Sequence, residues 1–229
     1  MIEILYKSKN AVVIYKPHGI PAQSDPSGDK DAMALTSEML AECGEQSELW
    51  LIHRLDRAVS GLMIFARNKK SAAELSKTVK MRQITKEYLA VVSGVPSCGV
   101  MEDYLYKDSR TSKAFVVDRK RAGVKDARLF CVPITTAKTD NGDRTLVKIS
   151  LDTGRFHQIR AQLSHRGHSI LGDKKYGSHE SLRGGIALTA YRLSIDLFGE
   201  TIEVTRLPSS KDYPWSLFSE ADYDRSILC

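Results

Sequence analysis

The sequence predicts one α+β domain. Short apolar strands and amphipathic helices follow one another without the regular βαβ alternation of a parallel sheet. With 229 residues and 42% hydrophobic content, the chain can bury a substantial core. We find no internal repeat, no low-complexity segment and no clear linker. We therefore expect residues 1–229 to form a single domain.

The first elements are a strand and a helix. Residues 11–15 form an apolar run, Ala-Val-Val-Ile-Tyr, that is typical of a buried strand. The run ends at Lys16-Pro17-His18-Gly19, because Pro and Gly interrupt regular structure. Residues 31–43 are rich in Ala, Met, Leu and Glu, and this composition predicts a helix.

A second strand, a helix and a third strand come next. The continuous apolar run at residues 62–66 predicts the strand. Residues 71–81 have the pattern of an amphipathic helix, and Ser71 and Glu74 have the spacing of a capping box at its start. Residues 88–92, Tyr-Leu-Ala-Val-Val, predict the third strand, which Ser-Gly then closes.

The second half predicts more strands and one helix. Residues 107–125 contain seven Lys and Arg and are expected to form a solvated hairpin. Residues 145–151 alternate as a half-buried strand does. A helix should run from residues 153–154 to His165. Residues 188–197 predict a last strand, followed by a hairpin turn at residues 198–201.

Composition limits the partners and the compartment. The 34 Lys and Arg exceed the 28 Asp and Glu and give a net charge of +6, which is compatible with a polyanionic partner. The four cysteines are far apart and form no CxxC pair, as in a reduced protein without a zinc site. No apolar run is long enough for a membrane span, and the start lacks the pattern of a signal peptide. We therefore expect a cytoplasmic protein.

His53-Arg54-Leu55-Asp56 is the first motif that carries chemistry. The Asp56 carboxylate stands between Arg54 and Arg57, and nearby cations favour its ionised form. An ionised carboxylate on a rigid edge can act as a nucleophile. By itself, the same pattern is also that of a weak surface ion pair.

A second motif, residues 154–160, is dense in donors at the expected start of a helix. Helix N-termini attract anions, and His157 and Arg160 would share one helix face. A solvated helix face would give the same pattern. A metal site built from His157, His165 and His168 lacks convincing ligand spacing.

Taken together, these motifs resemble the RluA family of RNA pseudouridine synthases. The resemblance runs from about residue 4 to about residue 215. Its motifs occur in the family's order: His53-Arg54-Leu55-Asp56, Ser60-Gly61-Leu62, Lys86-Glu87-Tyr88, Thr153-Gly154-Arg155, His157-Gln158-Ile159-Arg160, Leu171-Gly172-Asp173 and Tyr176-Gly177.

The resemblance implies a fold and a set of site residues. The fold is a mixed, largely antiparallel sheet with flanking helices and a central RNA-binding cleft. Asp56 corresponds to the nucleophile, and Tyr88 to the tyrosine that stacks on the target base. Arg160 corresponds to the arginine that pairs with the catalytic Asp. Arg54 corresponds to a residue that can fill the space left by a flipped base, and Leu188 to the apolar lining of the base pocket.

The resemblance also implies the partner. The substrate would be a tRNA or rRNA stem-loop, the protein would act as a monomer, and the reaction would need no cofactor and no metal. The residues expected to contact RNA are His53, Arg54, Lys86, Arg155, His157 and Gln158. We expect the chain to have the compact form of the family, which lacks a separate N-terminal RNA-binding module. RNA affinity would then come from the catalytic domain, with the basic residues 107–125 as one contributor.

Several positions depart from the family pattern. Val59, Phe156, Gln162, Ser169 and Thr189 replace residues that are common there. None of these changes removes the Asp, Tyr or Arg of the expected site. A catalytically inactive RNA-binding protein of the same fold is the alternative.

Overall fold

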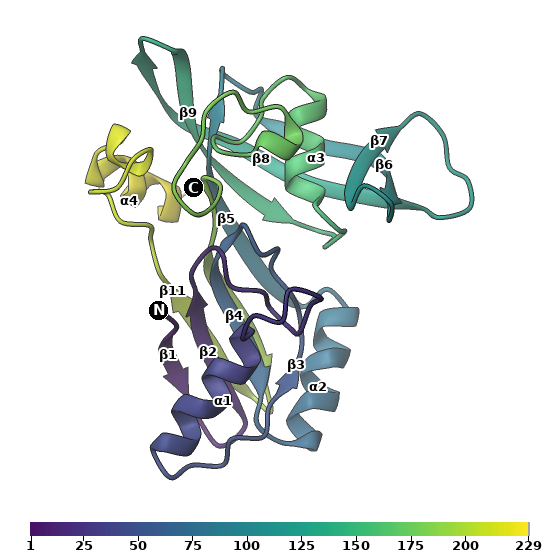
Figure 1. Ribbon diagram of the computed structural model, residues 1–229, viewed down its shortest axis with the longest axis vertical. Coiled ribbons are helices and arrows are strands. Elements are labelled where there is room, and N and C mark those ends of the chain that lie inside the picture. The colour runs from purple at the N-terminus through teal and green to yellow at the C-terminus, as the bar shows by residue number, and fades with distance from the viewer. Residues whose placement is uncertain (229) are drawn as a thin grey trace. The chain divides into compact units, whose positions relative to one another are not determined.

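The computed structural model describes residues 1–228, and the chain divides into two compact units (Figure 1). Unit 1 consists of residues 1–86 and 189–206, and unit 2 of residues 87–188 and those from 207 onward. Both units contain strands and helices, so the predicted α+β class is confirmed. The expectation of one domain over residues 1–229 stays a prediction. Within residues 1–228, no helix combines the length and apolar character needed to cross a bilayer.

Unit 1 is built on a mixed sheet in the order β1-β2-β4-β10. β11 pairs with β10, and β3 pairs with β4. Only the β4–β10 pairing is parallel among these, through Thr189 opposite Ser60 and Ala190 opposite Gly61. The strands are β1 (Glu3–Lys7), β2 (Ala11–Lys16), β3 (Trp50–Leu51), β4 (Ser60–Ala66), β10 (Leu188–Leu197) and β11 (Glu200–Thr205).

The turn between β10 and β11 is the predicted hairpin turn. Leu197 pairs with Glu200, so Phe198 and Gly199 are its two central residues. Their φ angles are 53° and 82°. Two positive φ angles characterise the type I′ turn that closes tight hairpins.

Two helices belong to unit 1, α1 (Ala32–Glu42) and α2 (Lys69–Lys80). The prediction for α1 is confirmed, but the predicted start of α2 is wrong. The helix begins two residues earlier, after Asn68, whose side-chain oxygen accepts a 2.8 Å hydrogen bond from the Ser71 backbone N–H. Ser71 is therefore the third helical residue and not the cap, because Asn68 already has the extended backbone of a cap.

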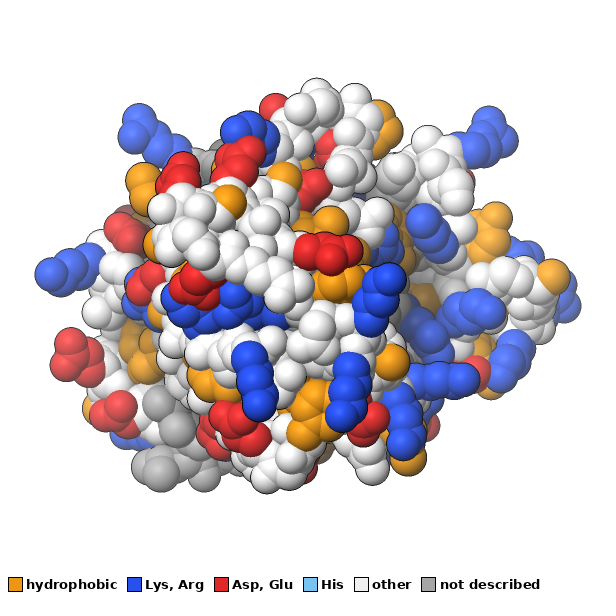
Figure 2. Space-filling view, turned by 90° about the horizontal axis from the view of Figure 1, so that it is seen from below, with side chains coloured by type: hydrophobic (Ala, Val, Ile, Leu, Met, Phe, Trp, Pro, Cys, Tyr) orange, Lys and Arg blue, Asp and Glu red, His pale blue; other side chains and the backbone are white. Residues whose placement is uncertain are grey.

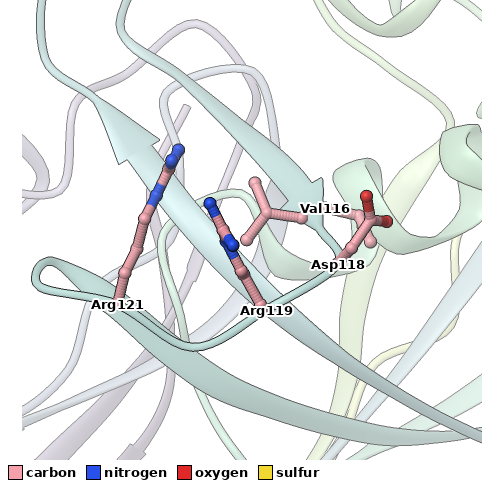
Figure 3. Close-up of a pocket in the computed structure, with 5 residues that line it drawn as sticks. Val116, Asp118, Arg119 and Arg121 are labelled. Carbon is pink, nitrogen blue, oxygen red and sulfur yellow. The ribbon is translucent and has the colours of Figure 1, made fainter.

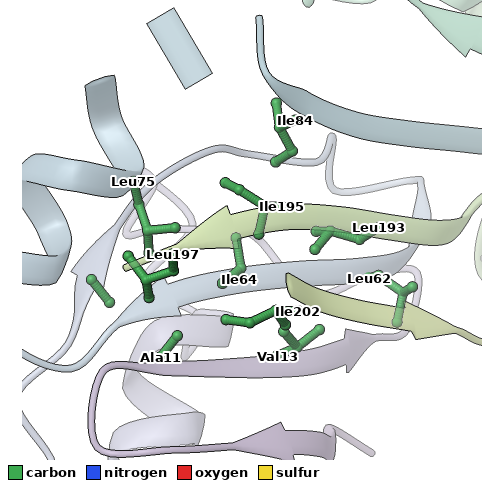
Figure 4. Close-up of a cluster of buried hydrophobic side chains, with 11 residues drawn as sticks. Ala11, Val13, Leu62, Ile64, Leu75, Ile84, Leu193, Ile195, Leu197 and Ile202 are labelled. Atoms are coloured by element: carbon green, nitrogen blue, oxygen red, sulfur yellow. The ribbon is translucent and has the colours of Figure 1, made fainter. Parts of the chain in front are cut away.

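The core of unit 1 joins the sheet to α2. Figure 4 shows side chains from β2, β4, β10, β11 and α2 packed against one another. Val13, Ile64, Leu75 and Ile195 are among its buried members. This packing fixes β4, and with β4 the loop that precedes it.

Unit 2 is built on an antiparallel sheet in the order β5-β9-β8-β6-β7. The predicted solvated hairpin is confirmed, since residues 107–125 lie on β6, β7, the start of β8 and the exposed loops between them. The strands are β5 (Ile84–Ser93), β6 (Gly99–Asp108), β7 (Lys113–Val117), β8 (Val124–Thr139) and β9 (Gly142–Leu151).

The helices of unit 2 are α3 (Gln158–His165) and α4 (Glu220–Leu228), with short 3-10 turns η1 (Lys174–Tyr176) and η2 (Trp215–Leu217). A small core joins α3 to β6, β7 and β8. It contains Leu105, Ala114, Ala161 and Tyr176. This contact places α3 and the loop before it against one face of the sheet.

Candidate active site

Asp56 lies in the loop of residues 52–59, between β3 and β4, and is half-buried. Its carbonyl accepts a 3.0 Å hydrogen bond from the Val59 N–H, which closes a turn. The Gly19 N–H donates a 2.8 Å hydrogen bond to the next carbonyl, that of Arg57. Backbone bonds on both sides therefore hold the turn that carries the carboxylate.

The two arginines that flank Asp56 have different surroundings. Arg57 binds the Asp29 carboxylate and donates a 2.9 Å hydrogen bond to the Ser27 hydroxyl. The positive charge of Arg57 is therefore partly neutralised by the loop that contains Ser27 and Asp29. Arg54 is exposed, as a residue that contacts RNA must be.

Lys16 is a residue of this site that the sequence did not reveal. Its side chain is fully buried, and the amine donates hydrogen bonds to the carbonyls of Pro17 (3.0 Å) and Ile20 (2.9 Å). Burial lowers its pKa to about 7, while the negative charge of Asp56 acts in the opposite direction. In the sequence, Lys16 is only the polar end of an apolar strand.

Gly61 allows β10 to approach β4 directly behind this loop. Its φ is +128°, and a Cβ atom there would lie 2.4 Å from the backbone nitrogen and oxygen of Ala190. No side chain fits at that distance. The close approach fixes the strand that follows Asp56.

His53 anchors β4. Its Nε2 accepts a 3.2 Å hydrogen bond from the Ile64 N–H, so this nitrogen carries no proton. Burial, together with the charge of Lys86, lowers the pKa of His53 to about 3. Lys86 is itself half-buried, and burial lowers its pKa as well. The ring is therefore neutral and supports the sheet through its hydrogen bond with Ile64. Contact of His53 or Lys86 with RNA stays a prediction.

Tyr88 and Leu188 are both buried side chains on strands. Tyr88 lies on β5 opposite Ile149 of β9. Leu188 is the first residue of β10, and the preceding Ala187 carbonyl accepts a 3.0 Å hydrogen bond from the Val91 N–H of β5. Both positions are therefore held by strand pairing, and their roles toward a target base stay predictions.

Arg160 is buried on α3 and forms a two-pronged ion pair with Asp173. Its Nε lies 2.7 Å from Oδ2 of Asp173 and its Nη2 lies 2.8 Å from Oδ1. The guanidinium also lies over the Tyr176 ring, 4.9 Å from its centroid. Asp173 and Tyr176 were part of the family motifs, but their contact with Arg160 could not be read from the sequence. The expected pairing of Arg160 with Asp56 stays a prediction.

The start of α3 differs from the prediction. The helix begins at Gln158 and not at residues 153–154, because the Gln158 side chain builds a turn in front of it. Its Oε1 accepts hydrogen bonds from the Thr153 hydroxyl (2.8 Å) and the Arg155 N–H (3.0 Å), and its Nε2 donates to the Arg128 carbonyl (3.1 Å). Gln158 thus has a role inside the protein, and its contact with RNA stays a prediction.

His157 precedes α3 with a left-handed backbone (φ 52°), so it does not share a helix face with Arg160 as expected. Both residues nevertheless contact Tyr176. The Tyr176 hydroxyl accepts from the Ala114 N–H (2.8 Å) and lies 3.0 Å from Nδ1 of His157. Burial, Arg160, Lys175 and Lys107 lower the pKa of His157 to about 3, so the ring is neutral.

The turn before α3 carries an exposed cation and a half-buried aromatic ring. Arg155 is exposed, and its Nε donates a 2.9 Å hydrogen bond to the Asp126 carbonyl. Phe156 stacks on His157 with ring centroids 3.8 Å apart, and Lys107 lies 4.6 Å from the Phe156 centroid. The positive charges and the aromatic ring of this surface suit a polyanion that also carries flat aromatic rings. Among residues 1–228, no three His, Cys, Asp or Glu side chains gather as metal ligands would.

Comparison with known proteins shows which family and which relatives this chain resembles. Residues 10–165 match the family model described as RNA pseudouridylate synthase. The chain is 29% identical over 219 residues to an uncharacterized RNA pseudouridine synthase of Haemophilus influenzae, with 93% of this chain and 90% of the relative covered. It is 31% identical over 189 residues to tRNA pseudouridine synthase C of Haemophilus ducreyi, with 80% and 77% covered.

A further relative and two solved structures complete the comparison. Ribosomal large subunit pseudouridine synthase D of Xylella fastidiosa is 32% identical over 189 residues, 80% of this chain but 54% of that protein. The structure of human RNA pseudouridylate synthase domain containing 4 gives a TM-score of 0.74 at 24% identity, covering 98% of this chain and 92% of the other. Human RNA pseudouridylate synthase domain containing 1 gives 0.78 at 21% identity, covering 100% and 95%. These two structures show a common fold.

Proposed function

Because this chain belongs to the RNA pseudouridylate synthase family, we propose that it converts specific uridines of tRNA or rRNA to pseudouridine with Asp56 as the nucleophile. Family membership makes it an isomerase that acts on RNA uridine. The observation that carries the assignment of Asp56 is its setting. It is a half-buried carboxylate on a turn held by backbone bonds, and its negative charge acts on the buried amine of Lys16.

The chemistry suits a carboxylate. In the isomerisation, the bond between the sugar carbon C1′ and the base nitrogen N1 breaks, the uracil rotates, and a bond from C1′ to C5 forms. The base loses a proton at C5 and gains one at N1, so the atoms balance without oxidation or reduction. Asp56 can add to the sugar or stabilise the positive charge that develops there.

The other residues of the proposed site position the base and the carboxylate. Tyr88 stacks on the uracil and accepts the C5 proton, and Leu188 lines the base pocket. Arg160 keeps Asp56 ionised and oriented. The pairing of Arg160 with Asp173 supports this role, because it fixes the orientation of the guanidinium. Arg54 fills the space left by the flipped base, which offsets part of the cost of flipping.

The substrate is a structured RNA that this chain binds as a monomer in the cytoplasm, where tRNA and rRNA are found. The names of the relatives support both RNA classes. Exposed Arg155 and Arg54 suit contact with phosphates. His53, His157 and Gln158 contribute through the hydrogen bonds that hold their segments, and Lys86 contributes by contact with the RNA.

Incubation of the purified protein with total tRNA and with rRNA transcripts tests this proposal. Nucleoside mass spectrometry and chemical mapping should locate new pseudouridine at a small set of positions in one of the two classes. A reaction without protein is the control. Binding of these RNAs without any product would favour the inactive RNA-binding alternative.

A further inference from the structure

A hollow in unit 2 has no part in the function proposed so far. It has a volume of about 550 Å³, within the range of small-ligand sites. In Figure 3 the side chains of Arg119 and Arg121 extend from the β7–β8 loop in the same direction, beside Val116. Asp118 is turned away from the two guanidinium groups (Figure 3). The hollow thus combines two cations and one carboxylate with an apolar wall of Val116 and Val117.

The positive charge of this hollow is available to a ligand. Lys120 forms an ion pair with Asp126 at 2.7 Å. Within residues 1–228, the arginines on either side of it, Arg119 and Arg121, form no such pair. Residues 107–125 contain seven Lys and Arg but only two Asp and Glu. Figure 2 shows Lys and Arg side chains (blue) gathered on the right of the view. A polyanion therefore suits this surface.

Aromatic rings lie next to these cations. Tyr106 of β6 pairs with Phe115 of β7, and paired residues of antiparallel strands point to the same face of the sheet. The neighbouring Ala114 packs toward α3, so the two rings lie on the opposite face. Phe115 is 40% exposed, and the Arg121 guanidinium lies 5.5 Å from the Tyr106 ring centroid. Exposed rings beside cations are a platform on which bases stack.

We propose that Arg119, Arg121, Tyr106 and Phe115 form a second RNA-binding surface, which holds a phosphodiester group between the two arginines and stacks an unpaired base against Phe115. This inference rests on the proposed function, because it takes the RNA substrate as the ligand. RNA supplies both the negative charge and the flat apolar rings that this surface fits. The two rings of this surface lie on the face of the sheet opposite α3, which carries Arg160. A base stacked on Phe115 is therefore a part of the RNA away from Arg160.

Binding of a fluorescently labelled tRNA transcript, followed by anisotropy across a salt series, tests this surface. The double variant Arg119→Gln/Arg121→Gln should weaken binding and reduce the salt slope by about one for each phosphate that the variant no longer binds. The matched control is Lys138→Gln/Lys211→Gln, which removes two exposed charges of unit 2 elsewhere. The control should bind as the unchanged protein does.

A second variant tests the stacking. Phe115→Leu keeps an apolar side chain but removes the ring, and it should weaken binding of the same transcript by at least about fivefold. Wild-type affinity and salt slope in both the arginine variant and Phe115→Leu would overturn the surface. If the protein makes pseudouridine under those conditions, the proposed function stands without the surface. If it makes none but the variants lose affinity, the surface stands and the proposed function fails.

Discussion

Replacement of Asp173 by Asn removes a buried carboxylate that pairs with the buried Arg160 guanidinium, and we expect a large loss of stability in unit 2. The wild-type pair is bidentate, with contacts of 2.7 and 2.8 Å between buried side chains. An Asn has only one acceptor oxygen. Its NH₂ group would face the second N–H of the guanidinium, so a donor would meet a donor.

The expected magnitude follows from this burial. Removal of one partner of a buried ion pair costs about 3–5 kcal/mol, a large part of the roughly 5–15 kcal/mol that stabilises a typical domain. An exposed pair contributes about 1 kcal/mol at most. Glu102 pairs with Arg128 in the same unit, and both side chains are exposed. Glu102→Gln is therefore the matched control and should have little effect.

Urea unfolding followed by tryptophan fluorescence measures this loss. The chain has two tryptophans, Trp50 in unit 1 and Trp215 in unit 2. In a Trp50→Phe background, the fluorescence therefore reports on unit 2 alone. With a slope of about 1–3 kcal/mol per M, Asp173→Asn should lower the midpoint by roughly 1–5 M. A shift no larger than that of Glu102→Gln would refute the reasoning.

Two further predictions concern unit 1. Gly61→Ala places a Cβ 2.4 Å from the backbone of Ala190 at a positive φ. The thermal unfolding midpoint should therefore fall by more than about 2 °C. An unchanged midpoint would show that β4 and β10 can separate without cost. Burial lowers the pKa of Lys16 to about 7 from the ordinary 10.5. The unfolded chain then binds more protons between these pH values, and the unfolding free energy should rise as the pH rises through this window. Urea unfolding at pH 7 and pH 9 should show this rise in the wild type and lose it in Lys16→Met; an equal rise in both would contradict the assignment.

Local sequence patterns predicted β2, β4, β5, β9 and β10, because apolar runs and alternation are typical of core strands, but they did not predict β1, β3 or the long β8. The strand expected at residues 188–197 is β10, with the same bounds. The helix starts were harder to predict. Asn68 caps α2 ahead of Ser71, and the Gln158 side chain builds a turn before α3. Such side-chain hydrogen bonds leave no trace in hydrophobic periodicity.

The residues of the candidate site that belong to family motifs could be predicted. The contacts that these residues make in the folded protein could not. Asp56, Tyr88 and Arg160 follow from the family resemblance. The partner of Arg160 in unit 2, Asp173, lies 13 residues away in a separate turn, and Lys16 is buried by packing that the sequence does not display. Such contacts depend on tertiary structure.

The loss of the C5 hydrogen from RNA that carries 5-tritiated uridine tests most directly whether Asp56 is the nucleophile. The tritium leaves when C5 becomes attached to the sugar. The wild type and Asp140→Asn, which changes an exposed carboxylate on the β8–β9 turn, should release tritium. Asp56→Asn should release none while it still binds the RNA. Release of tritium by Asp56→Asn at the wild-type rate would contradict the account.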